Sequence, residues 1–173
     1  MPDTPESSEP AYRGVIISVV RERWPGAEHL YDVVRHPGAA AVLPVTPTGE
    51  VLLVRQFRPA IRQTLVEMPA GLLDVDGEDA LSCAARELLE ETGYVAAEWR
   101  RLGIIHNAIG YSDEGIELWL ARGLELHAQK LEPGEFLEVF TLPLAQAQAM
   151  VRDGRITDAK TVAGLLQAAL QEE

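Results

Sequence analysis

The sequence predicts an α/β or α+β fold, in which strands combine with one central helix and two C-terminal helices. Short apolar segments rich in Val, Ile and Leu, separated by Gly and Pro, fill the first 70 residues and recur after residue 100. A continuous helical pattern that ends in glycine lies between them, and two amphipathic segments close the chain. Strands and helices in this order indicate packed layers around one core.

The N-terminal region differs from the rest of the chain. Residues 1–11 are acidic and rich in proline, which predicts a disordered tail rather than a signal or transit peptide. Residues 13–23 and 29–36 flank a Pro25-Gly26 turn and predict an antiparallel hairpin. We therefore expect a tail over 1–11, a β-hairpin over 12–37 and the main domain over 38–173.

The main domain is expected to carry strands on both sides of a central helix. The expected strands are Ala39–Thr46, Val51–Phe57, Leu65–Pro69 and, after the helix, segments near Arg101–His106, Ile116–Arg122 and Phe136–Leu142. Pro143 opens an amphipathic helix that ends at Asp153-Gly154, and a last helix begins at about Asp158.

The central helix has clear start and stop signals. Either Glu78 or Asp79 begins it and places negative charge at its N-terminus, and Gly93 follows its last turn. Its expected buried stripe consists of Leu81, Ala84, Ala85 and Leu88. The only cysteine, Cys83, is expected to be a packing residue, since a lone thiol makes neither a zinc site nor a disulfide.

Three glutamates on this helix point to its chemistry. Glu87, Glu90 and Glu91 stand at positions i, i+3 and i+4, so all three project toward one side, which we expect to face away from the apolar stripe. Like charges at this spacing cost about 0.2–0.5 kcal/mol per pair in an exposed helix. Hard carboxylate oxygens suit Mg²⁺, or alternatively Mn²⁺, and such ions bridge to substrate phosphates. An acidic helix face without a ligand is the alternative. Arg86 stands four residues before Glu90, which predicts an ion pair between the two.

The composition limits the partners. Hydrophobic residues make up 47% and charged residues 24% of the 173-residue chain, as in globular proteins. A net charge of −12 argues against nucleic-acid or anionic-membrane partners, which require clustered Lys and Arg. No apolar run reaches the ~18 residues that a membrane helix needs. One cysteine fits a reducing compartment, so a cytoplasmic location is expected.

The segment from Gly71 to Tyr94 resembles the Nudix box. Gly71 opens the pattern, and Glu78 is followed seven residues later by the run Arg86-Glu87-Leu88-Leu89-Glu90-Glu91-Thr92-Gly93-Tyr94. Six residues separate Gly71 from Glu78, where the family pattern has five, so the loop before the helix is one residue longer. The spacing from Glu78 to Glu91 matches the family throughout.

Further strings resemble the ADP-ribose pyrophosphatase branch of the Nudix hydrolases. They are HPGAAAVLPV, LLVRQFRPA, EMPAGLLD and GRITDAKTVAGLL, and the resemblance runs from about Arg13 to Leu170. This resemblance implies a Nudix αβα sandwich with a mixed sheet, and a homodimer in which the N-terminal hairpin, Val15–Val20 included, contacts the partner subunit.

The resemblance also implies roles for individual residues. Metal ligands would be Glu87 and Glu91, with Glu90 beside them and the backbone carbonyl of Ala70. Arg58 matches a substrate-binding arginine, and a guanidinium also suits two-pronged contact with phosphate.

The proton-accepting base is expected outside the helix, because metal coordination lowers the proton affinity of the helix carboxylates. Glu132 is the first candidate, followed by Glu135 and then Glu114, which lies in the GYSDEG loop and is also a candidate for substrate binding; Glu90 is retained as a further catalytic candidate. Before that loop the family favours Ser-Pro-Gly, whereas this chain has Ala108-Ile109-Gly110.

The expected function is Mg²⁺-dependent hydrolysis of the diphosphate bond of ADP-ribose, or of a related nucleoside diphosphate sugar, to AMP and ribose 5-phosphate. One alternative is another Nudix pyrophosphatase, acting on GDP-mannose, another nucleotide sugar or a nucleoside triphosphate. The other is a Nudix-fold sensor that binds a nucleotide without cleaving it. Such a sensor would tolerate loss of the metal carboxylates, whereas Glu87, Glu90 and Glu91 are all present.

Overall fold

The computed structural model describes residues 3–131 and 136–170, and the chain divides into two compact units. The first consists of the chain up to Gly38 together with His106–Gly115. The second consists of Ala39–Ile105 and the chain from Ile116 onward. Among the described residues, no helix is both long and apolar enough to span a bilayer.

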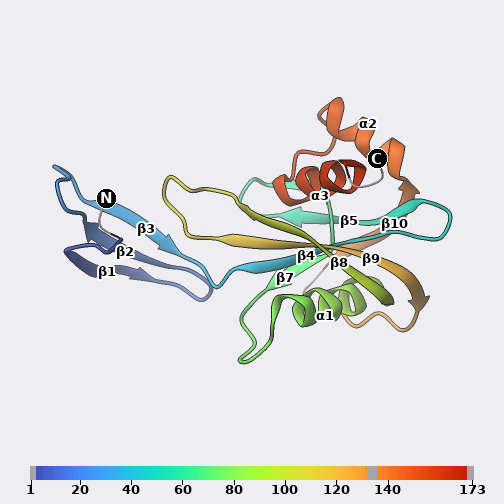
Figure 1. Cartoon of the computed structure of the whole chain (residues 1–173), viewed down its shortest axis with the longest axis horizontal. Helices are drawn as coiled ribbons and strands as arrows, with labels where there is room; N and C mark the ends of the chain where they lie inside the picture. The colour runs from blue at the N-terminus through green and yellow to red at the C-terminus, as the bar shows by residue number, and fades with distance from the viewer. Residues whose placement is uncertain (1–2, 132–135, 171–173) are drawn as a thin grey trace. The chain divides into compact units, whose positions relative to one another are not determined.

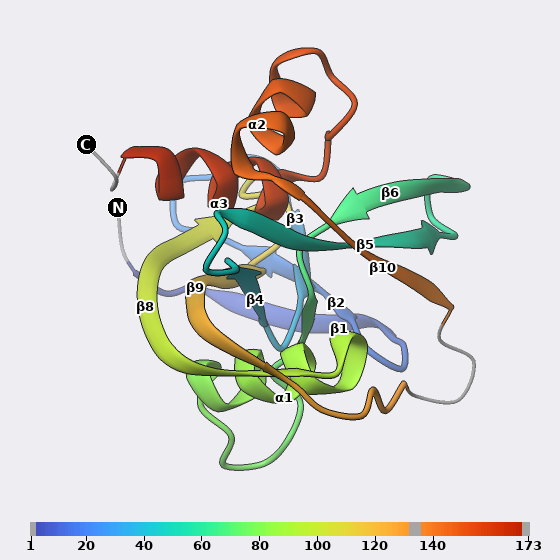
Figure 2. The same ribbon diagram turned by 90° about the vertical axis from the view of Figure 1, so that its right-hand side faces the viewer.

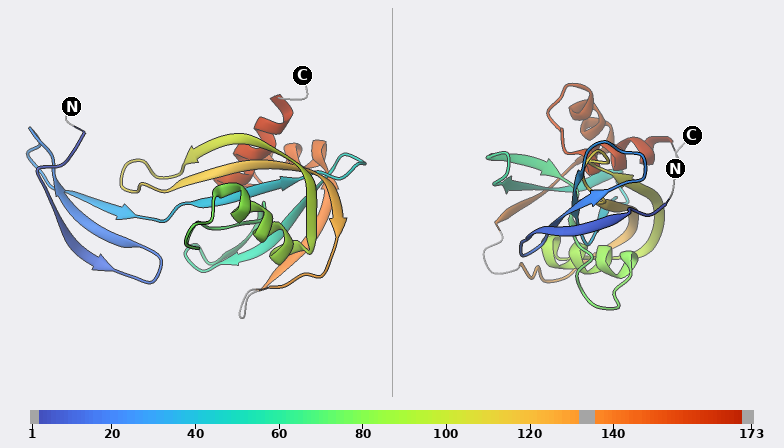
Figure 3. Two further views of the ribbon diagram at one scale, coloured as in Figure 1. Left: turned by 60° about the horizontal axis from the view of Figure 1, so that its bottom comes forward. Right: turned by 90° about the vertical axis from the view of Figure 1, so that its left-hand side faces the viewer.

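The first unit is a three-stranded antiparallel sheet in the order β1-β2-β3, which Figure 3 shows side by side. Its strands are β1 (Ser7–Arg13), β2 (Ser18–Arg23) and β3 (Tyr31–Arg35). The β2–β3 pairing is the hairpin that the sequence predicted. The expected tail over 1–11 is wrong for residues 7–11, because β1 pairs with β2 from Ser7 onward and thereby satisfies its backbone groups.

The second unit contains two sheets, one in the order β7-β4-β9-β8 and the other in the order β10-β5-β6. The first sheet is mixed, because β4 pairs antiparallel with β7 and parallel with β9. Its strands are β4 (Ala39–Pro44), β7 (Ala70–Leu72), β8 (Tyr94–His106) and β9 (Gly115–Leu126); those of the second sheet are β5 (Glu50–Arg58), β6 (Gln63–Glu67) and β10 (Leu137–Pro143).

Three helices cover these sheets on opposite sides. Helix α1 (Ala80–Thr92) lies on one side, and α2 (Leu144–Arg152) and α3 (Ala159–Leu170) lie on the other (Figures 1 and 2). This is the predicted αβα arrangement, and all three helices lie where the sequence placed them.

The core has two parts, and strand β4 divides them. Its even-numbered residues Ala40 and Val42 pack with Cys83, Ala84 and Leu88 of α1. Its odd-numbered residues pack with the two C-terminal helices, in a cluster that includes Ala41, Leu43, Leu144, Ala147 and Leu165. Successive side chains of a strand point to opposite faces, so a strand covered on both sides needs an uninterrupted apolar sequence. This explains the run AAAVL and holds β4 beside α1.

Candidate functional site

Helix α1 carries the acidic residues of the site, and its ends are set by local chemistry. The Asp79 side chain accepts a hydrogen bond from the Ser82 backbone N–H at 2.7 Å, so Asp79 and not Glu78 is the N-cap. Gly93 adopts the left-handed conformation, with φ of 76°, and donates its N–H to the Leu89 carbonyl. The predicted helix is confirmed, with its start signal at Asp79 and its stop signal at Gly93.

The orientation of the helix differs in part from the expectation. Its fully buried apolar residues are Cys83, Ala84 and Leu88, and Glu91 continues this stripe one turn later with only 2% of its surface exposed. The expectation that Glu91 faces away from the stripe is therefore wrong. The last turn of the helix, which carries Glu91, packs against the protein interior. Charge interactions are less screened there than on a solvated face.

Strand β7 approaches the helix closely at Gly71. A Cβ atom added to this glycine would lie 2.7 Å from Cγ of Glu87 and closer still to its carboxylate. The missing side chain at Gly71 thus makes room for the Glu87 carboxylate, and this is the physical reason for a glycine at the start of the motif.

Arg86 connects three of the carboxylates. Its Nε and Nη2 atoms donate to Glu78 at 3.0 Å each, and Nη1 donates to Glu87 at 2.5 Å and to Glu90 at 3.0 Å. The hydrogen bonds to Glu78, together with the charge of Glu87 and the hydrogen bonds to Glu90 and Glu87, raise the pKa of Arg86 and keep it charged. The sequence predicted only the pair with Glu90. Arg86 therefore offsets the repulsion between neighbouring carboxylates and orients Glu87 and Glu90.

Arg86, Glu87 and Glu90 line a cleft of about 190 Å³. Its lining comes from helix α1, from β7 and the loop after it, and from β5: Gln56, Arg58, Ala70, Gly71, Leu72, Asp74, Arg86, Glu87, Glu90 and Glu91. The predicted substrate-binding residue Arg58 and the predicted metal ligands thus share one cleft. The Arg58 guanidinium beside several carboxylates is a suitable arrangement for binding a phosphate, because the arginine and a metal ion on the carboxylates can hold the phosphate jointly.

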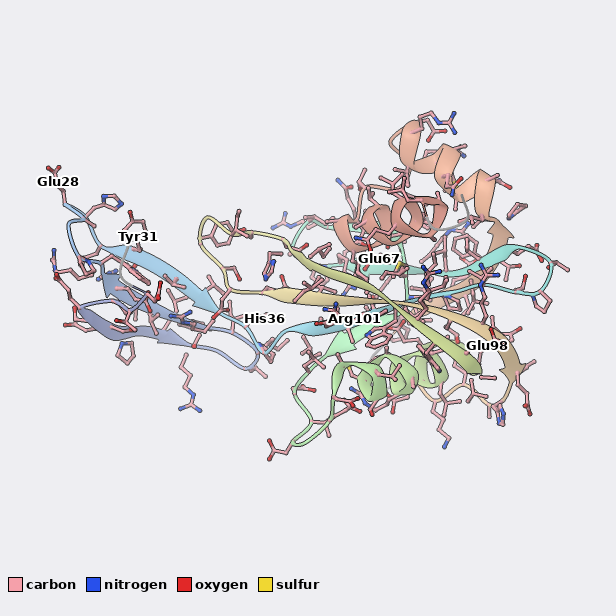
Figure 4. All side chains as sticks on the ribbon, in the orientation of Figure 1. Glu28, Tyr31, His36, Glu67, Glu98 and Arg101 are labelled. Atoms are coloured by element: carbon pink, nitrogen blue, oxygen red, sulfur yellow. The ribbon has the colours of Figure 1, made fainter. Side chains whose placement is uncertain are left out.

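Arg58 is held by a buried carboxylate. Its Nε and Nη2 atoms donate to the two oxygens of Glu67, each at 2.7 Å, and its side chain remains 40% exposed. These hydrogen bonds raise the pKa of Arg58. Burial alone would raise the pKa of Glu67, but the hydrogen bond from Arg58 and the charge of Lys160 outweigh burial and lower it. Figure 4 shows Glu67 close to helix α3.

The donor set fits Mg²⁺. Within residues 3–131 and 136–170, no three Asp, Glu, His or Cys side chains converge in a complete metal cage. Mg²⁺ is usually bound by one or two carboxylates together with waters and substrate phosphates, so a complete protein cage is not required. Glu87, Glu91 and Ala70 all line this cleft, so the two carboxylates and the Ala70 backbone carbonyl could supply hard oxygen ligands, and Gly71 provides the space that Glu87 occupies.

The three candidates for the proton-accepting base outside the helix lie in different parts of the chain. Glu132 and Glu135 lie outside the described residues. Glu114 belongs to the first unit, where its carboxylate accepts a hydrogen bond from Asn107 at 3.1 Å and lies 3.7 Å from Nε2 of His36. Its assignment to catalysis or to substrate binding stays a prediction.

Comparison with known proteins identifies the family. The NUDIX domain matches residues 34–165, which is most of the chain. The chain belongs to the Nudix family. This match and the relatives below confirm the predictions of the family, of its ADP-ribose pyrophosphatase branch and of an enzyme of the Nudix pyrophosphatase class.

Two curated relatives and one solved structure illustrate the similarity. The ADP-ribose pyrophosphatase of Bacillus subtilis is 38% identical over 143 residues, which cover 82% of this chain and 77% of the relative. The GDP-mannose pyrophosphatase of Citrobacter koseri is 36% identical over 148 residues, which cover 76% of each. The crystal structure of an ADP compounds hydrolase has a TM-score of 0.81, covers 97% of this chain and 92% of its own, and is 23% identical, so it supports the Nudix fold alone.

Sequence reasoning missed two features of this Nudix site. The motif arginine Arg86 was assigned one partner, although Glu78 at the start of the motif pointed to a second. Glu67 was not singled out, although a glutamate between Leu65-Val66 and Met68 is a signal of a buried charge that needs a cationic partner.

Proposed function

We propose that this Nudix enzyme hydrolyses the diphosphate bond of ADP-ribose in a Mg²⁺-dependent reaction that yields AMP and ribose 5-phosphate. The observation that carries the proposal is the shared cleft, in which Arg58 and the carboxylates of α1 lie together. The similarity to the Bacillus subtilis ADP-ribose pyrophosphatase supports the choice of substrate.

Each residue of the cleft has a role that follows from its chemistry. Glu87 and Glu91, with the Ala70 carbonyl, would hold the cation, which neutralises the diphosphate and lowers the pKa of the attacking water. Arg58 directs its remaining N–H donors to the phosphate oxygens, where charge increases in the transition state. Arg86 orients the carboxylates of Glu87 and Glu90 through hydrogen bonds from Nη1.

The proton acceptor is proposed to be a glutamate outside helix α1. Glu132 is our first choice, then Glu135 and Glu114, because a carboxylate that does not ligate metal keeps its proton affinity. Separate Glu→Gln substitutions at these three positions, assayed at saturating substrate and metal, should reveal one loss of kcat of about 10²-fold or more. A loss confined to Glu114→Gln would reverse our order.

A second substrate, GDP-mannose, is supported by the similarity to the Citrobacter koseri enzyme. The experiment that decides is a comparison of kcat/KM for ADP-ribose, ADP-glucose, GDP-mannose, NADH and dGTP, with product analysis. We expect ADP-ribose to rank first. A best substrate without a diphosphate-linked sugar would refute the proposal, and binding without turnover of any compound would favour a nucleotide sensor.

We also propose a homodimer in the cytoplasm, formed through the N-terminal sheet. The turn between β1 and β2 exposes Val15 fully and Ile16 to 54%, and clustered exposed apolar side chains favour a contact with another chain. Val15→Asp combined with Ile16→Asp should convert the dimer to a monomer in sedimentation-velocity measurements. A wild-type chain that is monomeric at all concentrations would contradict the dimer.

A further inference from the structure

A buried glutamate stands behind the arginine of the cleft. Glu67 is 1% exposed, and both of its oxygens accept hydrogen bonds from Arg58. A guanidinium has five N–H donors, so these two bonds leave three for an acceptor in the cleft. Because the fork of a guanidinium is planar and rigid, the position of the Glu67 carboxylate sets the plane of Arg58.

Lys160 holds the same carboxylate from helix α3. Its ammonium group, with 8% of the side chain exposed, contacts Oε2 of Glu67, the oxygen that also accepts from Nη2 of Arg58. Its other ionic partner is Asp158, at 3.1 Å. Charges of alternating sign therefore run from the start of α3 through Lys160 and Glu67 to Arg58 at the cleft.

The start of helix α3 is itself fixed to the strand that carries Glu67. Asp158 accepts a hydrogen bond from the backbone N–H of Thr161 at 3.0 Å and one from its hydroxyl at 2.6 Å. The Thr161 hydroxyl oxygen in turn accepts from the Met68 backbone N–H at 2.8 Å. Lys160 thus extends from a rigid helix end whose position relative to residues 67–68 is set by hydrogen bonds.

Stability alone is a weak explanation for this arrangement. Removing charged groups from water is costly, and apolar replacements of a buried ion pair are often as stable or more so. These ion pairs instead affect the cleft: because both oxygens of Glu67 are fixed, Arg58 has only one orientation toward a bound anion.

We propose that Lys160, acting through Glu67, is a positioning residue that orients Arg58 toward the diphosphate of the substrate. The inference rests on the proposed function, which places a diphosphate in this cleft. It gives a role to the DAKT segment of the sequence, which lies in α3 and the loop before it, outside the motif helix. Lys160 does not itself touch the substrate.

The test is a double-mutant cycle on ligand binding. The probe is inorganic pyrophosphate with Mg²⁺, measured by calorimetry, for the wild type, Lys160→Met, Arg58→Ala and the double variant. Misplacing a positioned group by ~1 Å can cost up to ~10²-fold, so we expect Lys160→Met to weaken binding by about tenfold or more. In the Arg58→Ala background the same substitution should leave the affinity unchanged, because no guanidinium remains to be oriented.

Three further variants separate the positioning role from effects on folding. Glu67→Gln combined with Lys160→Met removes both buried charges together, so that neither is left unpaired. This combination should weaken pyrophosphate binding when Arg58 is present and leave the affinity unchanged in the Arg58→Ala background. Lys160→Arg keeps a cationic donor and should recover most of the affinity. Arg155→Met is the matched control, because Arg155 forms an exposed pair with Asp153 just before the same helix.

The outcomes separate the two proposals. An equal loss of affinity in the Arg58 and Arg58→Ala backgrounds would show a general structural effect and overturn the inference, as would a wild type that does not bind pyrophosphate. Failure to cleave ADP-ribose, with the cycle as expected, would overturn the proposed substrate and leave the role of Lys160 intact.

Discussion

Substitution of Gly71 by alanine is the most direct test of the cleft geometry. The new Cβ atom would lie 2.7 Å from Cγ of Glu87, whereas ordinary contacts begin at 3.4 Å. The Glu87 side chain must therefore retreat by about 0.7 Å at Cγ, which is the difference between these distances, and by more at its carboxylate. Since Mg²⁺ needs near-octahedral oxygens at about 2.0–2.1 Å, this shift should prevent Glu87 from acting as the proposed metal ligand.

The expected result is a loss of activity without a matching loss of stability. We expect kcat to fall by about 10²-fold, the scale seen when one charge-stabilising group is lost from a transition state. The clash is with the end of a flexible side chain, so the free energy of unfolding should change by no more than about 1 kcal/mol. The assay combines ADP-ribose turnover over a Mg²⁺ titration with urea unfolding, and half-maximal activity should require more Mg²⁺.

The matched control is Gly110→Ala. A Cβ atom at Gly110 would have no neighbour within 4 Å, and its backbone is not in the left-handed region, so both activity and stability should stay at wild-type values. Wild-type turnover in Gly71→Ala would refute the reasoning, because it would mean that the position of the Glu87 carboxylate does not matter. A large loss of stability in Gly71→Ala would instead mean that the clash is relieved by a shift of the backbone and not by the Glu87 side chain.

Three other predictions concern single side chains. Glu91→Gln should lower kcat by at least ~10²-fold with a smaller effect on substrate binding; full activity of this variant in a chelator would contradict a metal role. The pKa of Glu67 lies below its ordinary value of 4.5, so its ion pairs stabilise the fold fully above that pH and are lost as the pH falls through the lowered pKa. The wild type should therefore lose its stability advantage over Glu67→Gln in acid, as measured by urea unfolding, and an advantage that does not change with pH would contradict this. Burial raises the pKa of Cys83 to about 12, so the native thiol should resist a disulfide reagent that labels the unfolded chain, and rapid native labelling would count against its burial.

Predictions from sequence succeeded where the signal was local. Helix α1 follows from an N-cap aspartate, a 3.6-residue apolar repeat and a terminal glycine, each of which acts within one or two turns. Strand β7, with three residues, is too short for a periodic pattern and exists because it pairs with β4. Strand β1 was missed for a related reason, since its polar sequence forms a strand only beside β2.

The sequence by itself determined the family, the fold class and the motif helix, and it selected the acidic residues and Arg58 as candidates for the site, because these depend on residue type and short spacing. Only the tertiary structure decided that Glu91 is buried and that Glu67 meets Lys160, a residue 93 positions away. It also decided that Tyr111 in the GYSDEG loop accepts a backbone hydrogen bond from Val34 of β3. Contacts between distant segments depend on how sheets and helices pack, and no local pattern of residues encodes that packing.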